Sequence, residues 1–354
     1  MQSKLQIVVN DAVASGLPGV SLHVQSGDES VSVVAGVMNK ETLEPVTSSS
    51  LFHAASVGKT FTATMILRLV DSGALQMDDI IERWLDPVMS AMVSNSNKIT
   101  IKMLLAHTSG IPDYFGERSS FFMDFAESAG RIWGPTEILG YIESLKGNFE
   151  PGTEFSYSNT NTLLLGVIAE RVTGMPLGMA LRYWVFEPAD LQNTFGVFES
   201  HGRTELARGY MPTNMFDENS LNVPLPTVGS DLDVSALLYS EGLGDAPIIS
   251  TPRDLNSFIR TLIDIDTLLS EKLKAQMLTE TTAGFGNGLG IFIDDGTNFR
   301  HSGGGWGLLS KMMYVTTEDL SFATTANGSF GIYAELYENY IERLMLVLEQ
   351  HLES

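Results

Sequence analysis

Residues 52–70, FHAASVGKTFTATMILRLV, admit two interpretations that imply different folds and different chemistry. The letters GKT end a phosphate-binding loop, whereas Ser56 three residues before Lys59 has the S-x-x-K spacing of a nucleophilic serine and its cation. A phosphate-binding loop has the form G-x-x-x-x-G-K-[ST], so its first glycine would fall at position 53. That position is His53, which lacks the backbone freedom that wrapping a phosphate requires. Nucleotide binding is therefore not predicted.

The S-x-x-K pair is weak evidence by itself, because composition alone would produce about one such pair in a chain of this length. Its position adds weight. Ser56 falls where an apolar-periodic helix begins, and Lys59 lies one turn later on the same face. The serine hydroxyl would then meet a cation and the positive end of the helix dipole. The competing interpretation makes Ser56 a helix N-cap and Lys59 a surface charge.

Apolar spacing on either side of this stretch predicts regular elements. Residues 3–15 carry apolar side chains at helical spacing and end at the turn letters GLPG, which predicts a helix. Residues 20–26 and 31–37 have the character of strands around the letters GDE, which predicts a β-hairpin. After Ser56 the apolar period continues as one long helix that Gly73 closes.

The rest of the chain has a helical middle and a strand-rich end. Helices are expected in the middle at residues 100–110, 135–147 and 160–174. Strands are expected near the end at residues 288–294, before the letters HSGGG and within 310–327, followed by a closing helix at 333–352. We predict an α/β (α+β) fold in which both chain ends form one antiparallel sheet flanked by helices. The β-α alternation of a doubly wound parallel sheet is absent.

This organisation predicts two domains. Residues 1–75 and 236–354 would form an α/β sandwich domain, and residues 76–235 would form a mainly helical domain inserted into it.

The composition narrows the classes of partner. The 354 residues include no cysteine and carry a formal net charge of −22, with a pI near 4.5. A surface this acidic repels phosphate backbones and anionic headgroups, so neither nucleic acid nor a membrane surface is expected as a partner. No apolar run is long enough for a transmembrane helix, and the first ten residues lack the features of a signal peptide. Disulfides are excluded, which leaves the compartment open.

Two downstream motifs supply what a serine nucleophile needs, namely a base and donors for the oxyanion. In EPGTEFSYSNTN, Tyr157 beside a lysine can act as a base, and Asn159 can hydrogen-bond both the lysine and a substrate carbonyl. In FRHSGGGWG, glycines after His301 let a substrate approach closely and leave an amide free as a donor. Each motif has a structural alternative: a half-buried loop tyrosine, or a turn with a satisfied histidine. Their joint occurrence in this order favours catalysis.

On these motifs the chain resembles the penicillin-recognising serine hydrolases, specifically the class C β-lactamase and DD-peptidase group. The resemblance covers most of the chain and is carried by FHAASVGKTFTA, ITIKMLLAHTSGIPDY, FEPGTEFSYSNTNTLLLGVIAERVTG, ISTPRDLNSFI and RHSGGGWG. It implies an α/β sandwich domain formed by both chain ends, a helical domain between them, and an active site at their interface.

The resemblance also implies roles for single residues. Ser56 would be the acylated nucleophile, Lys59 its proton partner, and Tyr157 the general base that later protonates the leaving group. Whether Lys59 or Tyr157 takes the first proton is left open. Asn159 would help to hold Lys59 and the substrate amide.

The third motif of the family would be His301 with Gly303, and both would bind substrate. The backbone amides of Ser56 and Gly304 would form the oxyanion hole. His107, in LLAHTSG, is assigned a structural role. The resemblance implies no metal and no cofactor, and the chain has no H-E-x-x-H motif and no G-x-S-x-G elbow.

His301 stands where many β-lactamases have a lysine. A histidine is mostly neutral at pH 7, so strong binding of a substrate carboxylate is not predicted. Arg300 does not replace the lysine, because adjacent strand residues face opposite sides. The H-x-G form resembles DD-carboxypeptidases, D-aminopeptidases, D-amino-acid amidases and β-lactamase-like esterases. An amine-bearing substrate would need a carboxylate, which the sequence does not identify.

The prediction is a metal-free serine hydrolase that forms an acyl-enzyme with D-amino-acid amide or peptide substrates, of the DD-carboxypeptidase or D-aminopeptidase type. The alternatives are a β-lactamase-like carboxylesterase, a weak class C-type β-lactamase, and an idle peptidoglycan-binding or sensor protein. Expected partners are small peptides, amides or esters, with β-lactams as covalent ligands. The resemblance favours the periplasm or the cell exterior, with the cytoplasm as the alternative.

Overall fold

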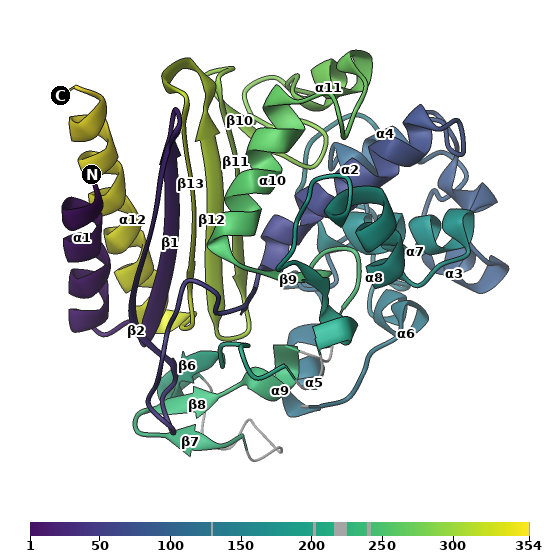
Figure 1. The fold of residues 1–354 in the computed structure, drawn as a ribbon. Coiled ribbons are helices and arrows are strands. Elements are labelled where there is room, and N and C mark those ends of the chain that lie inside the picture. The colour runs from purple at the N-terminus through teal and green to yellow at the C-terminus, as the bar shows by residue number, and fades with distance from the viewer. Residues whose placement is uncertain (129, 201–202, 216–224, 239–241, 354) are drawn as a thin grey trace.

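A computed structural model describes residues 1–128, 130–200, 203–215, 225–238 and 242–353. Its main element is a seven-stranded antiparallel sheet in the order β10-β11-β12-β13-β1-β2-β3 (Figure 1). The strands are β1 (Gly19–Ser26), β2 (Glu29–Asn39), β3 (Glu44–Pro45), β10 (Phe292–Asp294), β11 (Asn298–Gly305), β12 (Leu308–Val315) and β13 (Leu320–Ala326). Because β1 pairs with β13, the two ends of the chain meet inside one sheet. The predicted fold class is confirmed.

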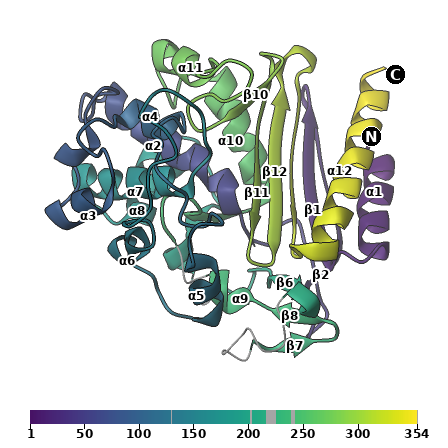
Figure 2. The same ribbon diagram turned by 180° about the vertical axis from the view of Figure 1, so that it is seen from behind.

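Helices cover both faces of this sheet, as the two opposite views show (Figures 1 and 2). On one face α1 (Gln2–Ala14) packs against α12 (Gly331–Leu352), and on the other face lies α10 (Pro252–Asp264). The apolar positions that predicted the first helix, such as Leu5 and Val9, are its buried face. Because both faces are covered, β1 is buried along most of its length.

The helical half of the molecule lies beyond α10 and is centred on α2 (Gly58–Asp71), which is buried on almost every side. Its buried threonines, Thr60, Thr62 and Thr64, donate to backbone oxygens, so this helix can lie in the centre of the fold without unsatisfied hydroxyls. Around it lie α3 (Pro87–Met92), α4 (Ile101–Leu105), α5 (Phe121–Glu127), α6 (Pro135–Gly140), α7 (Asn159–Thr173) and α8 (Leu177–Leu181). The remaining helices are α9 (Ser235–Leu238) and α11 (Glu271–Met277).

Two small sheets complete the fold. The first has the order β4-β9-β5, and the second has the order β6-β8-β7. Their strands are β4 (Phe52–His53), β5 (Phe195–Gly196), β6 (Tyr210–Pro212), β7 (Thr227–Val228), β8 (Asp231–Asp233) and β9 (Ile248–Ser250). The pairing of β4 with β9 joins the segment before Ser56 to a strand far along the chain, and this junction positions the site.

Three predicted elements are shorter than expected. The helix expected at 100–110 ends at Leu105, because His107 takes a left-handed conformation with φ 54°. The helix expected at 135–147 ends at Gly140, a residue of low helix propensity. The strand expected from 288 begins at Phe292, because Gly290 has φ 74° and approaches α2 so closely that a Cβ there would lie 2.3 Å from that of Ala63.

The division of the chain at residues 75 and 236 stays a prediction. Among the described residues, no single helix is long and apolar enough to cross a membrane. One pair, Asn159–Thr173 with Leu177–Phe186, meets the length and composition criteria together but is bent by 79°.

Candidate active site

A short turn between strand and helix presents Ser56. The chain leaves β4 and passes through Ala55, whose φ of 47° is unusual for a residue with a side chain. The Ala55 amide donates to Nδ1 of His53 at 3.1 Å, which helps to hold this conformation. Ser56 then lies in a single 3₁₀ turn, Ala55–Val57, directly before α2. His53, which excludes a phosphate-binding loop in the sequence, therefore supports the turn that carries Ser56.

Lys59 lies one turn into α2 and is fully buried. Its Nζ donates to Oγ of Ser56 and to the backbone carbonyl of Asp245, each at 2.9 Å. Burial by itself would lower the Lys59 pKa, but the nearby Tyr157 and the carboxylates of Asp245 and Asp113 outweigh it, so the pKa is raised. Lys59 is thus an ammonium at neutral pH, and it is no surface charge.

Tyr157 is held between a histidine and the lysine. Its ring stacks on that of His107, with 4.6 Å between the ring centres. The Nζ atom of Lys59, on α2, lies 5.4 Å from the centre of the Tyr157 ring. The Nδ1 atom of His107 accepts a hydrogen bond from the Ser158 amide at 3.2 Å, which ties the histidine to the segment that carries Tyr157. Burial, with the charge of Lys59, lowers the His107 pKa to about 3. His107 is therefore neutral and stacks on Tyr157, and the structural role assigned to it from the sequence stays a prediction.

Strand β11 runs against the serine turn at the glycine motif. A Cβ on Gly303 would lie 2.5 Å from the Ala54 carbonyl oxygen and 3.0 Å from the Ser56 amide nitrogen, so only glycine fits there. Ser310, opposite Gly303 on β12, donates to the same Ala54 oxygen at 2.7 Å and pins the turn to the sheet. Gly304 is exposed beside this contact. Ser56 and Gly304 are thus brought together, and their roles as oxyanion donors stay a prediction.

His301 is buried on the same strand. Its Nδ1 donates to the carbonyl of its neighbour Ser302 at 2.7 Å, and its ring lies 5.3 Å from that of Phe292. Burial, followed by the charges of Lys59 and Arg300, lowers the His301 pKa to about 3. His301 is therefore neutral at pH 7. Arg300 is engaged in an ion pair with a carboxylate on β10.

The side chain of Asn159 contacts Asp113 rather than Lys59. Its side-chain nitrogen donates to both oxygens of Asp113, at 3.1 and 3.0 Å. The contact with Lys59 that was expected of Asn159 is made by the Asp245 backbone carbonyl. Asn159 begins α7, and its own backbone amide also points at Asp113, so the carboxylate draws the side chain toward the helix start. Asn159 still lines the pocket, where a substrate can contact it.

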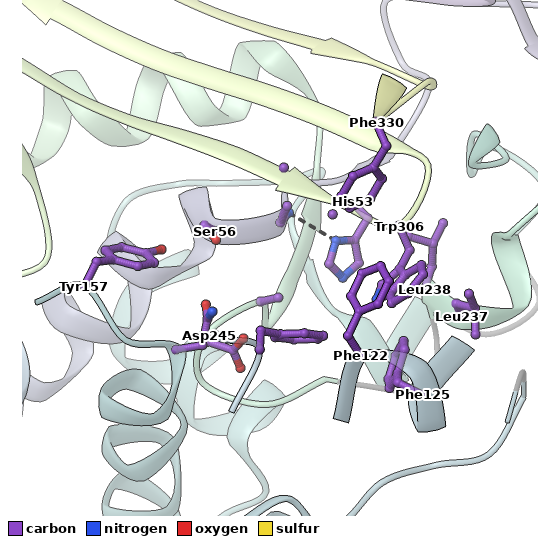
Figure 3. A pocket seen from close by; sticks show the side chains of 16 residues that line it. His53, Ser56, Phe122, Phe125, Tyr157, Leu237, Leu238, Asp245, Trp306 and Phe330 are labelled. Carbon is purple, nitrogen blue, oxygen red and sulfur yellow. Dashed lines mark hydrogen bonds between the residues drawn. The ribbon is translucent and has the colours of Figure 1, made fainter. Parts of the chain in front are cut away.

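A pocket of about 350 Å³ opens beside these residues (Figure 3). Ser56, Tyr157 and Asp245 lie at one end of it. The other end is apolar and is formed by Phe122, Phe125, Leu237, Leu238, Trp306 and Phe330. The volume and the apolar lining suit a small organic ligand. Within the described residues, no group of three or more histidines and carboxylates is arranged to hold a metal ion.

Residues 6–344 match the protein family described as Beta-lactamase. The chain belongs to the Beta-lactamase family. Penicillin-binding protein 4* of Bacillus subtilis (strain 168) is 30% identical over 308 residues, which cover 83% of this chain and 64% of that protein. Esterase EstB of Burkholderia gladioli is 31% identical over 205 residues, which cover 54% of this chain and 50% of that protein. D-amino acid amidase from Ochrobactrum anthropi SV3, complexed with L-phenylalanine, has a TM-score of 0.81 and 26% identity, with 99% of both chains covered.

These relatives confirm the predicted resemblance, and with the site described above they identify the chain as a serine hydrolase of the Beta-lactamase family. Sequence reasoning missed two acidic residues of this site. Asp113 follows HTSGIP in one of the family stretches but carries no catalytic signature by itself. Asp245 precedes β9 in a loop without a motif, so no local signal marks it.

The charges at the site of this family member are few. Lys59 is the cation, and the carboxylates of Asp113 and Asp245 face it, whereas His53, His107 and His301 have pKa values lowered by burial to about 4, 3 and 3. None of the described residues that line the pocket is a lysine or an arginine. The pocket therefore favours a neutral or cationic ligand over an anionic one.

Proposed function

We propose that this protein forms an acyl-enzyme on Ser56 and hydrolyses the amide bond of small substrates that carry an amine, of the D-amino-acid amide type. The lack of a lysine or arginine among the described residues that line the pocket carries the proposal, and the neutral state of the buried His301, which lies outside that lining, agrees with it. A peptide with a free C-terminus and a β-lactam both present a carboxylate, and none of the described residues that line the pocket is a lysine or an arginine that could pair with it, so its burial carries a desolvation penalty. An amide with an uncharged leaving group avoids that penalty.

The residues present support a mechanism without a metal. Lys59 donates to Ser56 Oγ as an ammonium, so in that state it cannot accept the serine proton. Tyr157, whose ring lies beside Lys59, acts as the general base and takes the proton on its side-chain oxygen as Ser56 Oγ attacks the substrate carbonyl carbon. It returns the proton to the leaving nitrogen as the C–N bond breaks, which leaves the acyl-enzyme. Water then attacks the acyl carbon by the same route, and Ser56 is released with its proton.

The oxyanion of each tetrahedral intermediate would be bound by the amides of Ser56 and Gly304, which the contact of β11 with the serine turn brings together. The apolar end of the pocket would hold the side chain of the substrate. The likeness to a D-amino acid amidase over nearly the whole chain supports this substrate class. The likeness to an esterase supports a second candidate, a carboxylesterase that uses the same groups.

The nucleophile is tested by labelling with a fluorophosphonate and measuring the intact mass. We expect one adduct on the wild-type protein and none on Ser56→Ala. A second measurement follows ammonia release from D-phenylalaninamide and L-phenylalaninamide. The D-enantiomer should be hydrolysed, and nitrocefin and peptides that end in D-alanine should be poor substrates. Turnover of p-nitrophenyl esters without any amide turnover would replace the proposal by the esterase, and an equal adduct on Ser56→Ala would remove Ser56 as the nucleophile.

A further inference from the structure

The two acidic residues of the site differ in how far their carboxylates are satisfied. Asp113 accepts from the backbone amides of Phe115 and Asn159 and from the side chain of Asn159, at 3.0 to 3.3 Å. Asp245 is 2% exposed, and its Oδ2 accepts from the Tyr114 hydroxyl at 2.8 Å. Its Oδ1 is buried and has no hydrogen-bond donor among the described residues. Asp245 is therefore the carboxylate with a free acceptor.

The position of Asp245 relates it to the reacting carbonyl. Nζ of Lys59 joins the Asp245 backbone oxygen to Oγ of Ser56, at 2.9 Å on each side. Asp245 also lines the pocket at the end that contains Ser56 and Tyr157, opposite the aromatic and leucine side chains (Figure 3). Ser56 and the Asp245 side chain therefore border the same end of the pocket, where one small ligand can contact both.

An acceptor of this kind is costly to bury without a donor, because a desolvated carboxylate oxygen loses its bonds to water. An ammonium group supplies three donors and the compensating charge. Among the described lining residues of the pocket there is no lysine or arginine to supply them, and Lys59 already donates to Ser56 and to the Asp245 backbone. A ligand in the pocket can supply the donor that Oδ1 of Asp245 lacks among the described residues.

We propose that Oδ1 of Asp245 binds the protonated α-amine of the substrate and selects amino-acid amides over their amine-free analogues. The substrate side chain then extends toward Phe122, Trp306 and Phe330. This inference rests on the proposed function, because it assigns the amine site of the same pocket. The competing role for Asp245 is indirect: its charge also stabilises the ammonium of Lys59, and through Lys59 it would affect every substrate alike.

The test uses inhibitors of ester turnover, so that it does not depend on amide hydrolysis. Hydrolysis of p-nitrophenyl butyrate at pH 7 is to be measured with increasing concentrations of 2-phenylethylammonium or of 2-phenylethanol, which has a hydroxyl in place of the charged group. We expect the ammonium to bind the wild-type protein on the order of 10- to 100-fold more tightly, as a charge-assisted hydrogen bond implies. In Asp245→Asn the two inhibitors should bind about equally. The ratio within one variant is independent of changes in its turnover rate.

Asp264→Asn is the matched control. Asp264 also accepts from a tyrosine hydroxyl, that of Tyr314 at 2.8 Å, but it lies at the end of α10 outside the pocket. This variant removes the same charge and should keep the wild-type ratio. A wild-type ratio near one would overturn the proposal even if Asp245→Asn did not fold. An unchanged ratio in Asp245→Asn, or an equal loss for both inhibitors, would leave Asp245 as a positioning residue for Lys59.

The two proposals can fail separately. A high inhibitor ratio without ammonia release from D-phenylalaninamide would refute the proposed function and keep the amine site. Hydrolysis of D-phenylalaninamide with a ratio near one would refute the amine site and keep the function. In wild-type protein, the amine-free 3-phenylpropionamide should also be hydrolysed with a kcat/KM at least about 10-fold lower than that of D-phenylalaninamide.

Discussion

Replacing Gly303 with alanine is expected to separate β11 from the serine turn. The new Cβ would lie 2.4 Å from Oγ of Ser310, 2.5 Å from the Ala54 carbonyl oxygen and 3.0 Å from the Ser56 amide nitrogen. Carbon–oxygen contacts in proteins are about 3.3 Å or longer, so the strand has to move by roughly 0.8 Å. Two of the three neighbours are backbone atoms, which cannot rotate away.

This displacement has two measurable consequences. Overpacking of this kind costs about 1–3 kcal/mol of unfolding free energy, so the thermal midpoint of a chain of 354 residues should fall by about 1–4 °C. The movement also separates the amides of Ser56 and Gly304, and a misplacement of about 1 Å, or the loss of one oxyanion donor, lowers turnover about 10²-fold. Differential scanning calorimetry and p-nitrophenyl butyrate hydrolysis measure the two effects.

Gly305→Ala is the matched comparison for Gly303→Ala. Gly305 lies on the same strand, neither glycine has a positive φ, and its Cβ would meet only the Cβ of Ala55 at 3.4 Å. The Gly305 variant should therefore unfold within about 1 kcal/mol of the wild-type protein, helped by the lower entropy of its unfolded chain. If Gly303→Ala matched Gly305→Ala in both midpoint and turnover, the close contact of β11 with the serine turn would be refuted.

Three further outcomes are expected. Lys59→Met keeps the buried volume but removes the ammonium at Ser56, so the rate of fluorophosphonate adduct formation should fall at least about 10²-fold by intact mass. The pKa of His301 is lowered to about 3, so between pH 6.5 and 4 its imidazole is protonated in the unfolded chain but not in the folded protein. The free energy of unfolding therefore decreases as the pH is lowered through this range. His301→Gln should reduce the slope of unfolding free energy against pH by up to about 1.4 kcal/mol per pH unit, measured by urea titrations. The buried Tyr337 hydroxyl has no hydrogen-bond partner among the described residues, so Tyr337→Phe should leave the thermal midpoint unchanged or raised. Tyr340→Phe, which loses a 2.8 Å hydrogen bond to β13, should lose about 1 kcal/mol, and equal effects of the two would contradict this difference.

Much of the architecture follows from local sequence patterns. The apolar period of residues 3–15 predicted α1, the GDE turn predicted the β1–β2 hairpin, and the period after Ser56 predicted α2. These predictions succeed because hydrophobic periodicity is a property of neighbouring residues. The ends of α4 and α6 were not predictable to the residue, because a left-handed His107 or an early stop at Gly140 depends on the packing around it.

The site likewise combines features that local sequence predicted with contacts that only the fold established. Local spacing placed Ser56 and Lys59 on one face, and the structure places Lys59 Nζ 2.9 Å from Ser56 Oγ. The contact of Asn159 was not foreseen, since Asp113 attracts its side chain and the Asp245 carbonyl takes its expected place at Lys59. The catalytic roles of these residues and the domain boundaries stay predictions.

The amino-acid sequence by itself determined which reactive groups the protein has, in what order they occur, and which helix carries the serine with its lysine. Folding determined the protonation states of those groups and which of them are in contact. His301 is neutral because the sheet and the helical half desolvate it, and Asp245 meets Lys59 because the pairing of β4 with β9 brings distant segments together. Desolvation and long-range contact depend on residues far apart in the chain, so no local pattern records them.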